Sequence, residues 1–411
     1  MRRLKMEKNI FIIIALVIIV ALLSGCADNT IPPGWPPAVN PVASPVITNI
    51  SPADSAIGGV LDITIKGSNF GATVDQCYVY FGTEPGVITS FTSNQIVTLR
   101  PRIYGETIST RVVVQLADNV AQINYKIKRV VTPLGAFPGA TLTNTLASDT
   151  SGNVYVAVIN ARDTSGTYKV IRKISANGIM SDYATYSTSL TISFMRVAPN
   201  GTLYALMTGS GGEFHSVGRG GGNLTKLFGF GENMLCFDFD QYGVIYAGGT
   251  SGTNKTIDIV QATTVAKGPS YDNYSIMAVR VFQNYVYVLA VGGTTTGVYR
   301  HQISGGTLGT QEQVLLWSTT GDYATSKVKD LTFSANGDMY IATDRSVDPI
   351  LLVYYSTGTV TGMRPLYKNL ITTAVGGLTW TGNILCERVM SSDPSVVAID
   401  MGNSGAPYYG R

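Results

Sequence analysis

Four charged residues stand inside apolar, strand-like stretches of the region from residue 142 onward. They are Arg196, Asp238, Arg280 and Asp330. Carboxylates that converge on one point can hold a cation such as Ca²⁺, which takes oxygen ligands. Two of the four residues are cationic, however, and arginine beside aspartate favours ion pairing over metal binding. We therefore predict either structural ion pairs or a polar ligand-binding site at these four residues.

The chain has few histidines and cysteines, which are the other residue types that commonly act as catalytic bases or metal ligands. The chain has two histidines, His215 and His301, and we expect both at the surface rather than in a catalytic role. Without a nearby histidine, a serine nucleophile lacks its usual base. No cysteine or histidine spacing indicates a zinc site, and the glycine run at 218–222 lacks the Lys-Ser/Thr of a phosphate loop. We expect no catalytic residue, no metal and no cofactor, so an enzyme is the less favoured interpretation.

Composition and charge restrict the fold and the partners. Only 13% of the 411 residues are charged, whereas there are 45 glycines and 23 tyrosines, which favours strands and tight turns. A chain of this length exceeds one ordinary core, so at least two units are expected. The net charge of +3 is accounted for by residues 1–25, which leaves the body neutral. We therefore expect no nucleic-acid partner, because a basic footprint is missing.

A short phrase returns six times after residue 142. It is a turn glycine or asparagine, followed by a tyrosine and small apolar residues. The copies centre on Tyr155, Tyr204, Tyr246, Tyr287, Tyr340 and, with leucine in place of tyrosine, Leu385. A period of about 40–50 residues with strand-like units is the sequence signature of a β-propeller. We predict a six-bladed β-propeller over residues 129–411, with the four charged residues on its inner strands.

The sixth predicted blade is short, because only a brief tail follows the strand at 396–400. A propeller must close, since an open edge strand would pair with other chains. Either the tail around Tyr408 and Tyr409 or the incoming segment 129–132 must supply the missing outer strand. The second alternative would lock the preceding domain rigidly to the propeller.

The turn-plus-tyrosine repeat resembles NHL-type and related six-bladed propellers. Such relatives include lactonases and other hydrolases that hold a metal in the central channel with acidic and asparagine side chains. The resemblance therefore implies an alternative function, a metal-dependent lactonase-like hydrolase with its site in the channel. That alternative requires Asp149, Asp238, Asp240 and Asp330 to converge within reach of one metal ion.

Residues 45–128 alternate in hydropathy over about seven short strands, the number expected of an immunoglobulin-like sandwich. Several pieces occur in a characteristic order, namely Ile50-Ser51-Pro52, Gly58-Gly59, residues 63–71, residues 79–82 and Pro101. In this order they resemble the IPT/TIG family. The resemblance implies a spacer or an interaction module. Some eukaryotic relatives contact DNA, but the predicted secretion signal and the lack of a basic loop argue against DNA here. We therefore predict an all-β chain, an immunoglobulin-like sandwich followed by the propeller.

The first 25 residues read as a signal peptide. A short basic start precedes an unbroken apolar run at 10–23, whose 14 residues are fewer than the ~20 that a spanning helix needs. Leu23-Ser24-Gly25-Cys26 then resembles the lipobox of bacterial lipoproteins. The resemblance implies cleavage before Cys26 and lipidation of its thiol, which would anchor the protein in a membrane.

Residues 26–44 read as a proline-rich tether between the lipid and the folded part. In lipoproteins of this kind an aspartate after the cysteine implies retention in the inner membrane, so the resemblance together with Ala27 implies the outer membrane. We expect the protein in the cell envelope, at the outer membrane or cell surface. The whole layout resembles surface lipoproteins of Bacteroidetes-like bacteria.

The predicted function is a lipid-anchored surface binding or scaffold protein whose propeller face recognises a glycan or a protein partner. Trp317, Trp380 and Tyr323 are the aromatic candidates for ligand contact, although the apolar surroundings of Trp380 favour core packing. Cys77, Cys236 and Cys386 lie in apolar strands of separate units. We expect buried thiols, although a disulfide would be permitted outside the cytoplasm.

Overall fold

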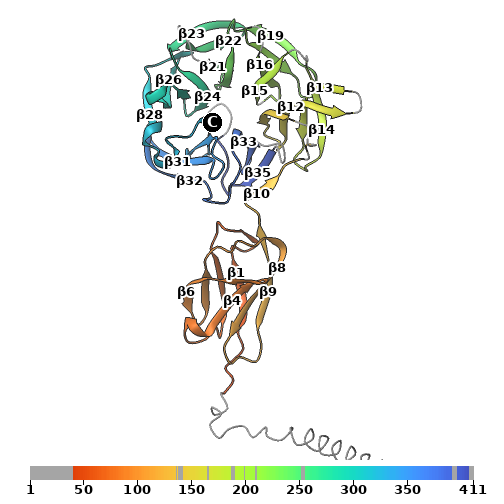
Figure 1. Ribbon diagram of the computed structural model, residues 1–411, viewed down its shortest axis with the longest axis vertical. Coiled ribbons are helices and arrows are strands. Elements are labelled where there is room, and N and C mark those ends of the chain that lie inside the picture. Colours follow the sequence, from red (N-terminus) through yellow and green to blue (C-terminus); the bar gives the residue numbers. More distant parts are fainter. Residues whose placement is uncertain are drawn as a thin grey trace, which may run out of the picture.

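The computed structural model describes residues 40–135, 137, 142–163, 166–186, 190–198, 200–208, 211–250, 255–390 and 396–406. These residues form a β-sandwich and a ring of β-blades, with the sandwich attached to one side of the ring (Figure 1). The predicted signal peptide, Cys26, most of the tether, Tyr408 and Tyr409 lie outside the described residues. Where the chain is described, no helix is long and apolar enough to cross a membrane.

The sandwich contains two mainly antiparallel sheets packed face to face. One sheet has the order β1 (Val46–Ser51), β3 (Ile63–Ser68), β7 (Gln95–Thr98), β6 (Ile88–Thr92). The other has the order β2 (Ser55–Ile57), β9 (Ala121–Lys128), β8 (Gly105–Val114), β4 (Cys77–Phe81), β5 (Glu84–Gly86). Inward residues such as Ile63, Phe81 and Val112 are completely buried between the sheets. The immunoglobulin-like sandwich is thus confirmed, with two three-residue strands, β2 and β5, added to the seven expected.

Six further sheets form the blades of the propeller, numbered here from the N-terminal side. Blade 1 contains β11 (Leu142–Ser148), β12 (Val154–Asp163), β13 (Gly166–Ile174) and β14 (Met180–Thr185). Blade 2 contains β15 (Thr191–Val197), β16 (Leu203–Thr208), β17 (Glu213–Val217) and β19 (Thr225–Gly229). Blade 3 contains β20 (Met234–Phe239), β21 (Ile245–Gly249), β22 (Thr256–Gln261) and β23 (Thr264–Ser270). The two-residue β18 (Gly222–Asn223) extends the outer edge of blade 1.

Blades 4 and 5 follow the same pattern. They are β24 (Ser275–Phe282), β25 (Tyr285–Val291), β26 (Gly297–Ser304), β28 (Glu312–Leu316) with the small β27 (Thr307–Leu308); and β29 (Val328–Phe333), β30 (Met339–Thr343), β31 (Ile350–Ser356), β32 (Thr359–Pro365). Short 3-10 helices lie in the connections, at η1 (Val74–Gln76), η2 (Gly293–Thr295), η3 (Trp317–Thr319) and η4 (Gly321–Tyr323).

Blade 6 is completed by the segment that enters the propeller. It contains β33 (Val375–Thr381), β34 (Ile384–Val389), β35 (Val396–Asp400) and, on the outside, β10 (Val131–Pro133). β10 pairs antiparallel with β35, with Thr132 opposite Ala398. The inner strand β33 also packs against β11 of blade 1, which closes the ring. Of the two closures considered from the sequence, the structure therefore adopts the one through residues 129–132.

The repeated phrase forms the hairpin between the first and second strands of a blade. In blade 3, the Asp240 carboxylate accepts hydrogen bonds from the backbone N–H groups of Tyr242 (2.8 Å) and Val244 (3.0 Å). It also accepts one from the Tyr246 hydroxyl at 3.1 Å. Blade 1 repeats this arrangement, with the Tyr155 hydroxyl 3.0 Å from Asp149. The repeat is thus explained by turn chemistry and packing rather than by a ligand.

The sandwich packs directly on blade 6. Ile57 and Val60 of the sandwich belong to the same apolar cluster as Leu370 of the propeller. A β-carbon added at Gly59 would lie 3.0 Å from the Leu370 side chain, so the two domains are in close contact here. At the edge of the junction, the Lys128 ammonium lies 3.5 Å from the Asp400 carboxylate. Shared strand pairing and a shared core therefore join the two domains.

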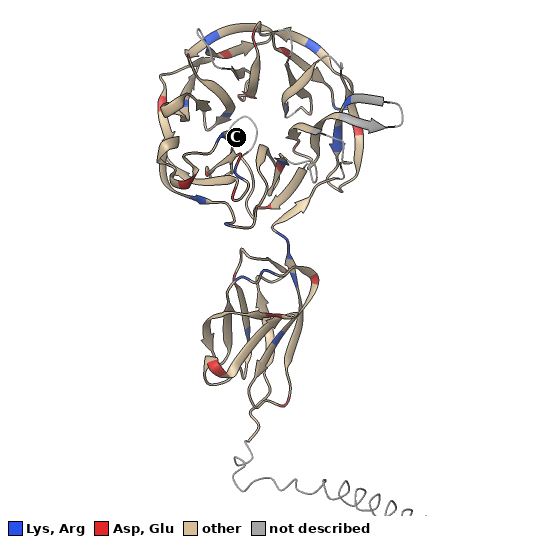
Figure 2. Ribbon diagram, in the orientation of Figure 1, with Lys and Arg blue, Asp and Glu red and all other residues tan. Residues whose placement is uncertain are grey.

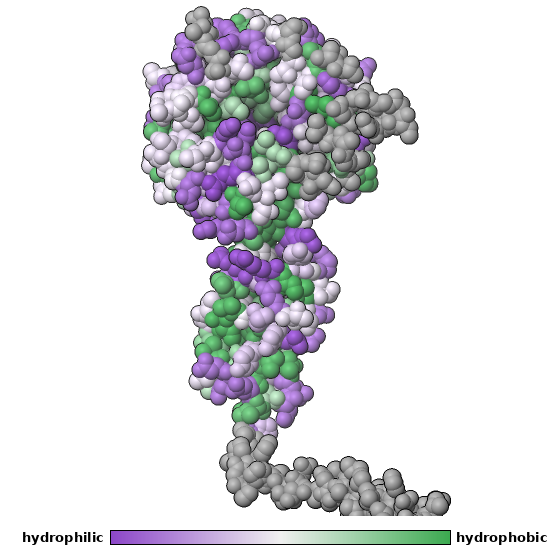
Figure 3. All heavy atoms as spheres, in the orientation of Figure 1, coloured by the Kyte–Doolittle hydropathy of each residue, from purple (hydrophilic) through white to green (hydrophobic). Residues whose placement is uncertain are grey.

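The surface chemistry is mixed around the ring. Charged residues of both signs are distributed over the blades in the view of Figure 2. On the face shown in Figure 3, hydrophobic and hydrophilic residues are interspersed rather than gathered into a broad apolar patch. Cys77, Cys236 and Cys386 are all buried free thiols, as expected, and burial raises the pKa of each one.

Candidate ligand-binding sites

The four predicted channel residues come together on consecutive inner strands, β15, β20, β24 and β29. Arg196, Asp238, Arg280 and Asp330 are each at most 5% exposed. Such burial of charged side chains is tolerated when they are paired and hydrogen bonded. The sequence therefore identified a real cluster, and its hydrogen bonds indicate what it does.

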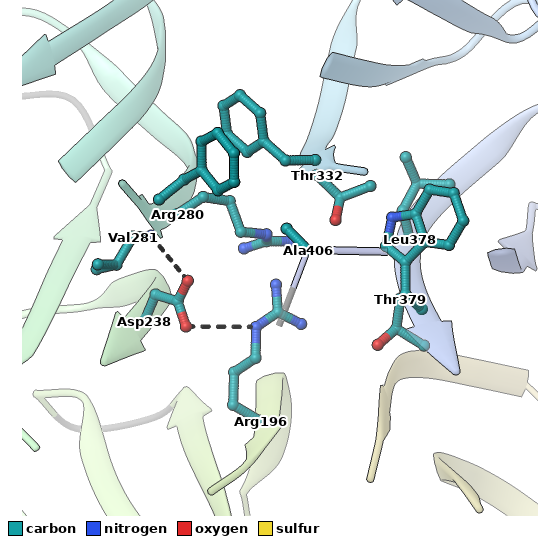
Figure 4. A pocket seen from close by; sticks show the side chains of 11 residues that line it. Arg196, Asp238, Arg280, Val281, Thr332, Leu378, Thr379 and Ala406 are labelled. Atoms are coloured by element: carbon teal, nitrogen blue, oxygen red, sulfur yellow. Dashed lines mark hydrogen bonds and ion pairs between the residues drawn. The ribbon is translucent and has the colours of Figure 1, made fainter. Parts of the chain in front are cut away.

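Each aspartate ties its own blade to the next. The Asp238 carboxylate accepts hydrogen bonds from the N–H groups of Phe239 (3.0 Å) and Val281 (2.9 Å), the latter on blade 4. The Arg196 Nε atom lies 4.0 Å from the same carboxylate (Figure 4). Burial raises the pKa of the Asp238 carboxyl, against the opposing effect of Arg196 and Arg280.

The Asp330 carboxylate makes shorter polar contacts than that of Asp238. Its carboxylate accepts a hydrogen bond from Arg280 at 2.6 Å and others at 2.8 Å from the N–H groups of Leu331 and Leu378. Blades 4, 5 and 6 are thereby joined at a single side chain. The ion-pair interpretation thus accounts for both aspartates, and a ligand role for these four residues needs separate support.

The space beside these residues is small. A pocket of about 30 Å³ is lined by Arg196, Asp238, Arg280, Thr332 and Trp380, among others, with Ala406 of the C-terminal segment at its edge (Figure 4). A volume of this size holds one or two water molecules. A sugar or a peptide therefore does not fit into the channel at this level.

The four aspartates required by a metal site are not assembled into one. Asp149 and Asp240 are turn residues, whereas Asp238 and Asp330 bind arginines and backbone N–H groups. Across the described ranges, no three His, Cys, Asp or Glu side chains form a group that could hold a metal ion. The condition set for the lactonase-like alternative is therefore not met by these four carboxylates.

The expectation that both histidines lie at the surface was wrong. His215 lies on β17, 9% exposed, with its Nε2 atom 2.8 Å from Glu213. His301 is completely buried, its Nε2 atom 2.9 Å from the Tyr271 hydroxyl and its Nδ1 atom 2.9 Å from the Gly309 carbonyl oxygen. Burial lowers the pKa of His301, so both of its contacts suit a neutral ring. The alternation of inward and outward residues along β26 could have indicated this burial, because His301 lies on the same strand face as the buried Tyr299 and Ile303.

The proposed aromatic contacts are also buried. Trp317 and Tyr323 are each 3% exposed, and the Trp317 indole N–H donates to the Ser326 carbonyl at 3.0 Å. Trp317 does line a hollow of about 500 Å³ between blades 4 and 5, but it offers little of its ring. Trp380 is 7% exposed within an apolar cluster, as its apolar strand predicted.

A groove that sequence reasoning missed lies between blades 3 and 4. Two adjoining hollows, of about 580 and 720 Å³, share Gln261, Gly305 and Gly306. We call this surface the blade 3–4 groove; its walls include the hairpin residues Gln241, Tyr242, Gln261, Asn284, Gly305 and Gly306. Four hairpin turns from two blades therefore build one continuous depression.

The groove exposes an aromatic ring beside neutral amides. Tyr242 is 82% exposed, and both Gln241 and Gln261 are exposed to solvent. Gly306 allows the close approach of Gln261, because a β-carbon there would lie 2.4 Å from the Gln261 amide nitrogen. Its φ of 80° also suits glycine.

Charged residues along the groove are already engaged. Lys267 lies 2.6 Å from Glu232 and 2.9 Å from Asp258, while the Asp240 carboxylate is occupied by its own turn. What the groove presents to a ligand is therefore an aromatic face, amide donors and acceptors, and backbone.

Comparisons with known proteins agree with this architecture. Residues 45–128 match the model of the IPT/TIG domain family. No curated protein sequence matches the chain. Among solved structures, an auxiliary nutrient binding protein from Bacteroides ovatus shares 14% identity over 88% of this chain and 98% of that chain, with a TM-score of 0.50. A putative phosphatase from Bacteroides thetaiotaomicron shares 10% identity over 88% and 97%, with a TM-score of 0.54.

Identities this low indicate a shared fold and nothing further about activity. The chain therefore joins an IPT/TIG domain to a six-bladed propeller, and it is similar in fold to these propeller-like bacterial proteins.

Proposed function

We propose that the protein is a lipid-anchored surface protein that binds a glycan in the blade 3–4 groove. The observation that carries this proposal is the 82% exposed Tyr242 beside the exposed amides of Gln241 and Gln261. An exposed tyrosine offers a flat apolar face, against which the C–H face of a sugar ring can stack, and a polar hydroxyl. Side-chain amides both donate to and accept from sugar hydroxyls.

The charge of the groove supports a neutral glycan over a charged partner. Lys267 and Asp240 are the charged residues that line it, and each is already paired within the blade. The volumes of the two adjoining hollows, about 580 and 720 Å³, suit a ligand of several sugar units rather than a single small molecule.

The other parts of the proposal concern placement. The lipobox-like residues 23–26 support attachment through Cys26 to a membrane of the cell envelope, with the outer membrane favoured. The tether at 26–44 and the IPT/TIG domain would then hold the propeller away from that membrane. The docking of the sandwich on blade 6 favours a spacer of fixed orientation.

A metal-dependent lactonase-like hydrolase receives no comparable support. It needs acidic side chains directed at a common ion, and the two channel aspartates are instead committed to arginines and backbone N–H groups. The groove, by contrast, presents polar groups that the described part of the chain leaves available.

The proposal is tested by retention of the purified protein on a panel of neutral and acidic polysaccharides. We expect at least one neutral polysaccharide to retain it, and Tyr242→Ala to weaken that affinity by about tenfold or more, equivalent to about 1.4 kcal/mol. Tyr78→Ala is the matched control, because Tyr78 is 43% exposed on the sandwich, away from the groove. Retention by no polysaccharide, or equal losses in the two variants, would contradict glycan binding in the groove.

A further inference from the structure

Two arginines and two aspartates meet among the buried groups of the central channel. Arg196 and Arg280 are paired with Asp238 and Asp330. A third arginine, the half-buried Arg388 of β34, interacts with Asp330. The Arg388 guanidinium lies against Gly376, where an added β-carbon would be 1.8 Å from one of its nitrogens. Two guanidinium groups, those of Arg196 and Arg280, lie together in a region where burial makes charge costly.

Glu387 precedes Arg388 on β34. Glu387 is completely buried, and neither of its carboxylate oxygens has a hydrogen-bond partner within the described ranges. Burial raises its pKa to about 8, so the carboxyl is neutral at pH 7. Glu387 therefore adds no negative charge to this part of blade 6 at neutral pH.

The pocket of about 30 Å³ is lined by Arg196 and Arg280 together with Asp238. Figure 4 shows the guanidinium groups of Arg196 and Arg280 directed into the same space beside Ala406. Both also lie over the ring of Phe194, with their Cζ atoms 4.5 and 5.4 Å from its centroid. Two like charges held beside one aromatic ring repel each other, and burial strengthens the repulsion.

A buried donor faces the same pocket. The Trp380 side chain lines it and is 7% exposed, and its indole N–H has no hydrogen-bond partner among the described residues. A buried N–H without an acceptor costs about 1–3 kcal/mol. Indole can donate but cannot accept, so the missing partner must be an acceptor.

We propose that this pocket binds a small monoanion, of the size of chloride or a single carboxylate group, between Arg196, Arg280 and the Trp380 indole N–H. An anion at this point would reduce the repulsion between the arginines and accept the tryptophan N–H. The volume leaves no room for a sugar, which separates this site from the blade 3–4 groove. The bound ion would stabilise the junction of the inner strands.

The C-terminal segment encloses the site. An added β-carbon at Gly405 would lie 2.1 Å from Trp380 Cγ, so the backbone crosses directly over the indole. The next N–H, of Ala406, donates to the Phe333 carbonyl at 2.9 Å. This contact holds the segment at the edge of the pocket, and we expect slow exchange of the ion as a result.

The test measures thermal stability at constant ionic strength while gluconate, which is too large for the pocket, is replaced by chloride, bromide or formate. We expect a saturable rise in melting temperature with at least one small anion. Trp380→Phe, which removes the N–H and keeps an aromatic ring, should weaken the apparent affinity by about tenfold. Trp317→Phe is the matched control, because the Trp317 N–H donates to Ser326 outside the pocket.

Crystals grown in bromide provide a second measurement that does not depend on a variant. An anomalous peak within hydrogen-bonding distance of the Trp380 indole nitrogen would identify a halide site. A response to formate alone, with formate density in the pocket, would identify a carboxylate site. Equal melting temperatures in all four salts, together with only water in the pocket, would overturn the proposal.

Discussion

The Asp330 carboxylate lies 2.6 Å from a terminal guanidinium nitrogen of Arg280, and this ion pair joins the inner strands of blades 5 and 4. Both side chains are at least 90% buried, so neither charge can be solvated if its partner is lost. We expect Asp330→Ala to lower the free energy of unfolding by about 3–5 kcal/mol, because it leaves Arg280 buried and unpaired.

Chemical denaturation measures this change. Glu106→Ala is the matched control, because it breaks a 2.5 Å ion pair with Lys126 in which Glu106 is 81% exposed. An exposed pair adds little to stability, so this variant should unfold as the wild type does. Similar losses in the two variants would show that burial of the Asp330–Arg280 pair does not determine its contribution.

The turn of blade 3 depends on the Tyr246 hydroxyl, which donates to the buried carboxylate of Asp240 at 3.1 Å. Tyr246→Phe removes this charge-assisted hydrogen bond, and we expect a loss of about 1.5–3 kcal/mol in the free energy of unfolding. Tyr204 holds the same place in blade 2, where Ala198 stands in the position of the aspartate. Tyr204→Phe should therefore have a much smaller effect, and the proposed role of the turn fails if both variants lose the same stability.

The buried carboxyl of Glu387 makes stability dependent on pH. Its pKa is raised from 4.5 to about 8 by burial. Between these values the unfolded chain releases the proton and the folded chain keeps it, so this group lowers stability as pH rises, by at most about 1.4 kcal/mol per pH unit. Glu387→Gln carries no titrating proton.

We therefore expect Glu387→Gln to become progressively more stable than the wild type from about pH 5 to about pH 8, with no further gain above that range. Thermal unfolding at several pH values measures the difference. A constant difference across the whole range would show that Glu387 is already ionised in the folded protein. Gln115→Glu on the sandwich is the control, because it introduces a carboxylate at an exposed position. Its stability relative to the wild type should not change progressively between about pH 5 and about pH 8.

The propeller could be predicted from the sequence because every blade needs the same turn and the same packing, so the same short sequence pattern recurs. Asp238 and Asp330 could also be found, because a charge inside an apolar strand stands out locally. The blade 3–4 groove could not, since Tyr242 and Gly306 come from turns of different blades that are adjacent only after folding. The burial of His301 was missed because a single polar residue on an apolar strand face can be satisfied by partners far along the chain.

The sandwich contacts the propeller through Leu370, which lies in the connection between β32 of blade 5 and β33 of blade 6 and packs against Gly59. Leu370→Asp would place a charge in this contact, where it has to be solvated by separating the domains. We expect the propeller to remain folded, because β10 still pairs with β35, while the sandwich gains freedom relative to it. Small-angle X-ray scattering should then show a larger radius of gyration and a broader distribution of interatomic distances.

Leu227→Asp is the matched control for that experiment, because Leu227 is 43% exposed on β19 of blade 2. It introduces the same charge far from the junction and should leave the scattering profile unchanged. If Leu370→Asp also leaves the profile unchanged, the strand pairing of β10 with β35 is sufficient to hold the sandwich in place, and the apolar contact is not what fixes the spacer. If it unfolds the propeller instead, as circular dichroism would show, the two domains share one core and cannot be separated by a single side chain.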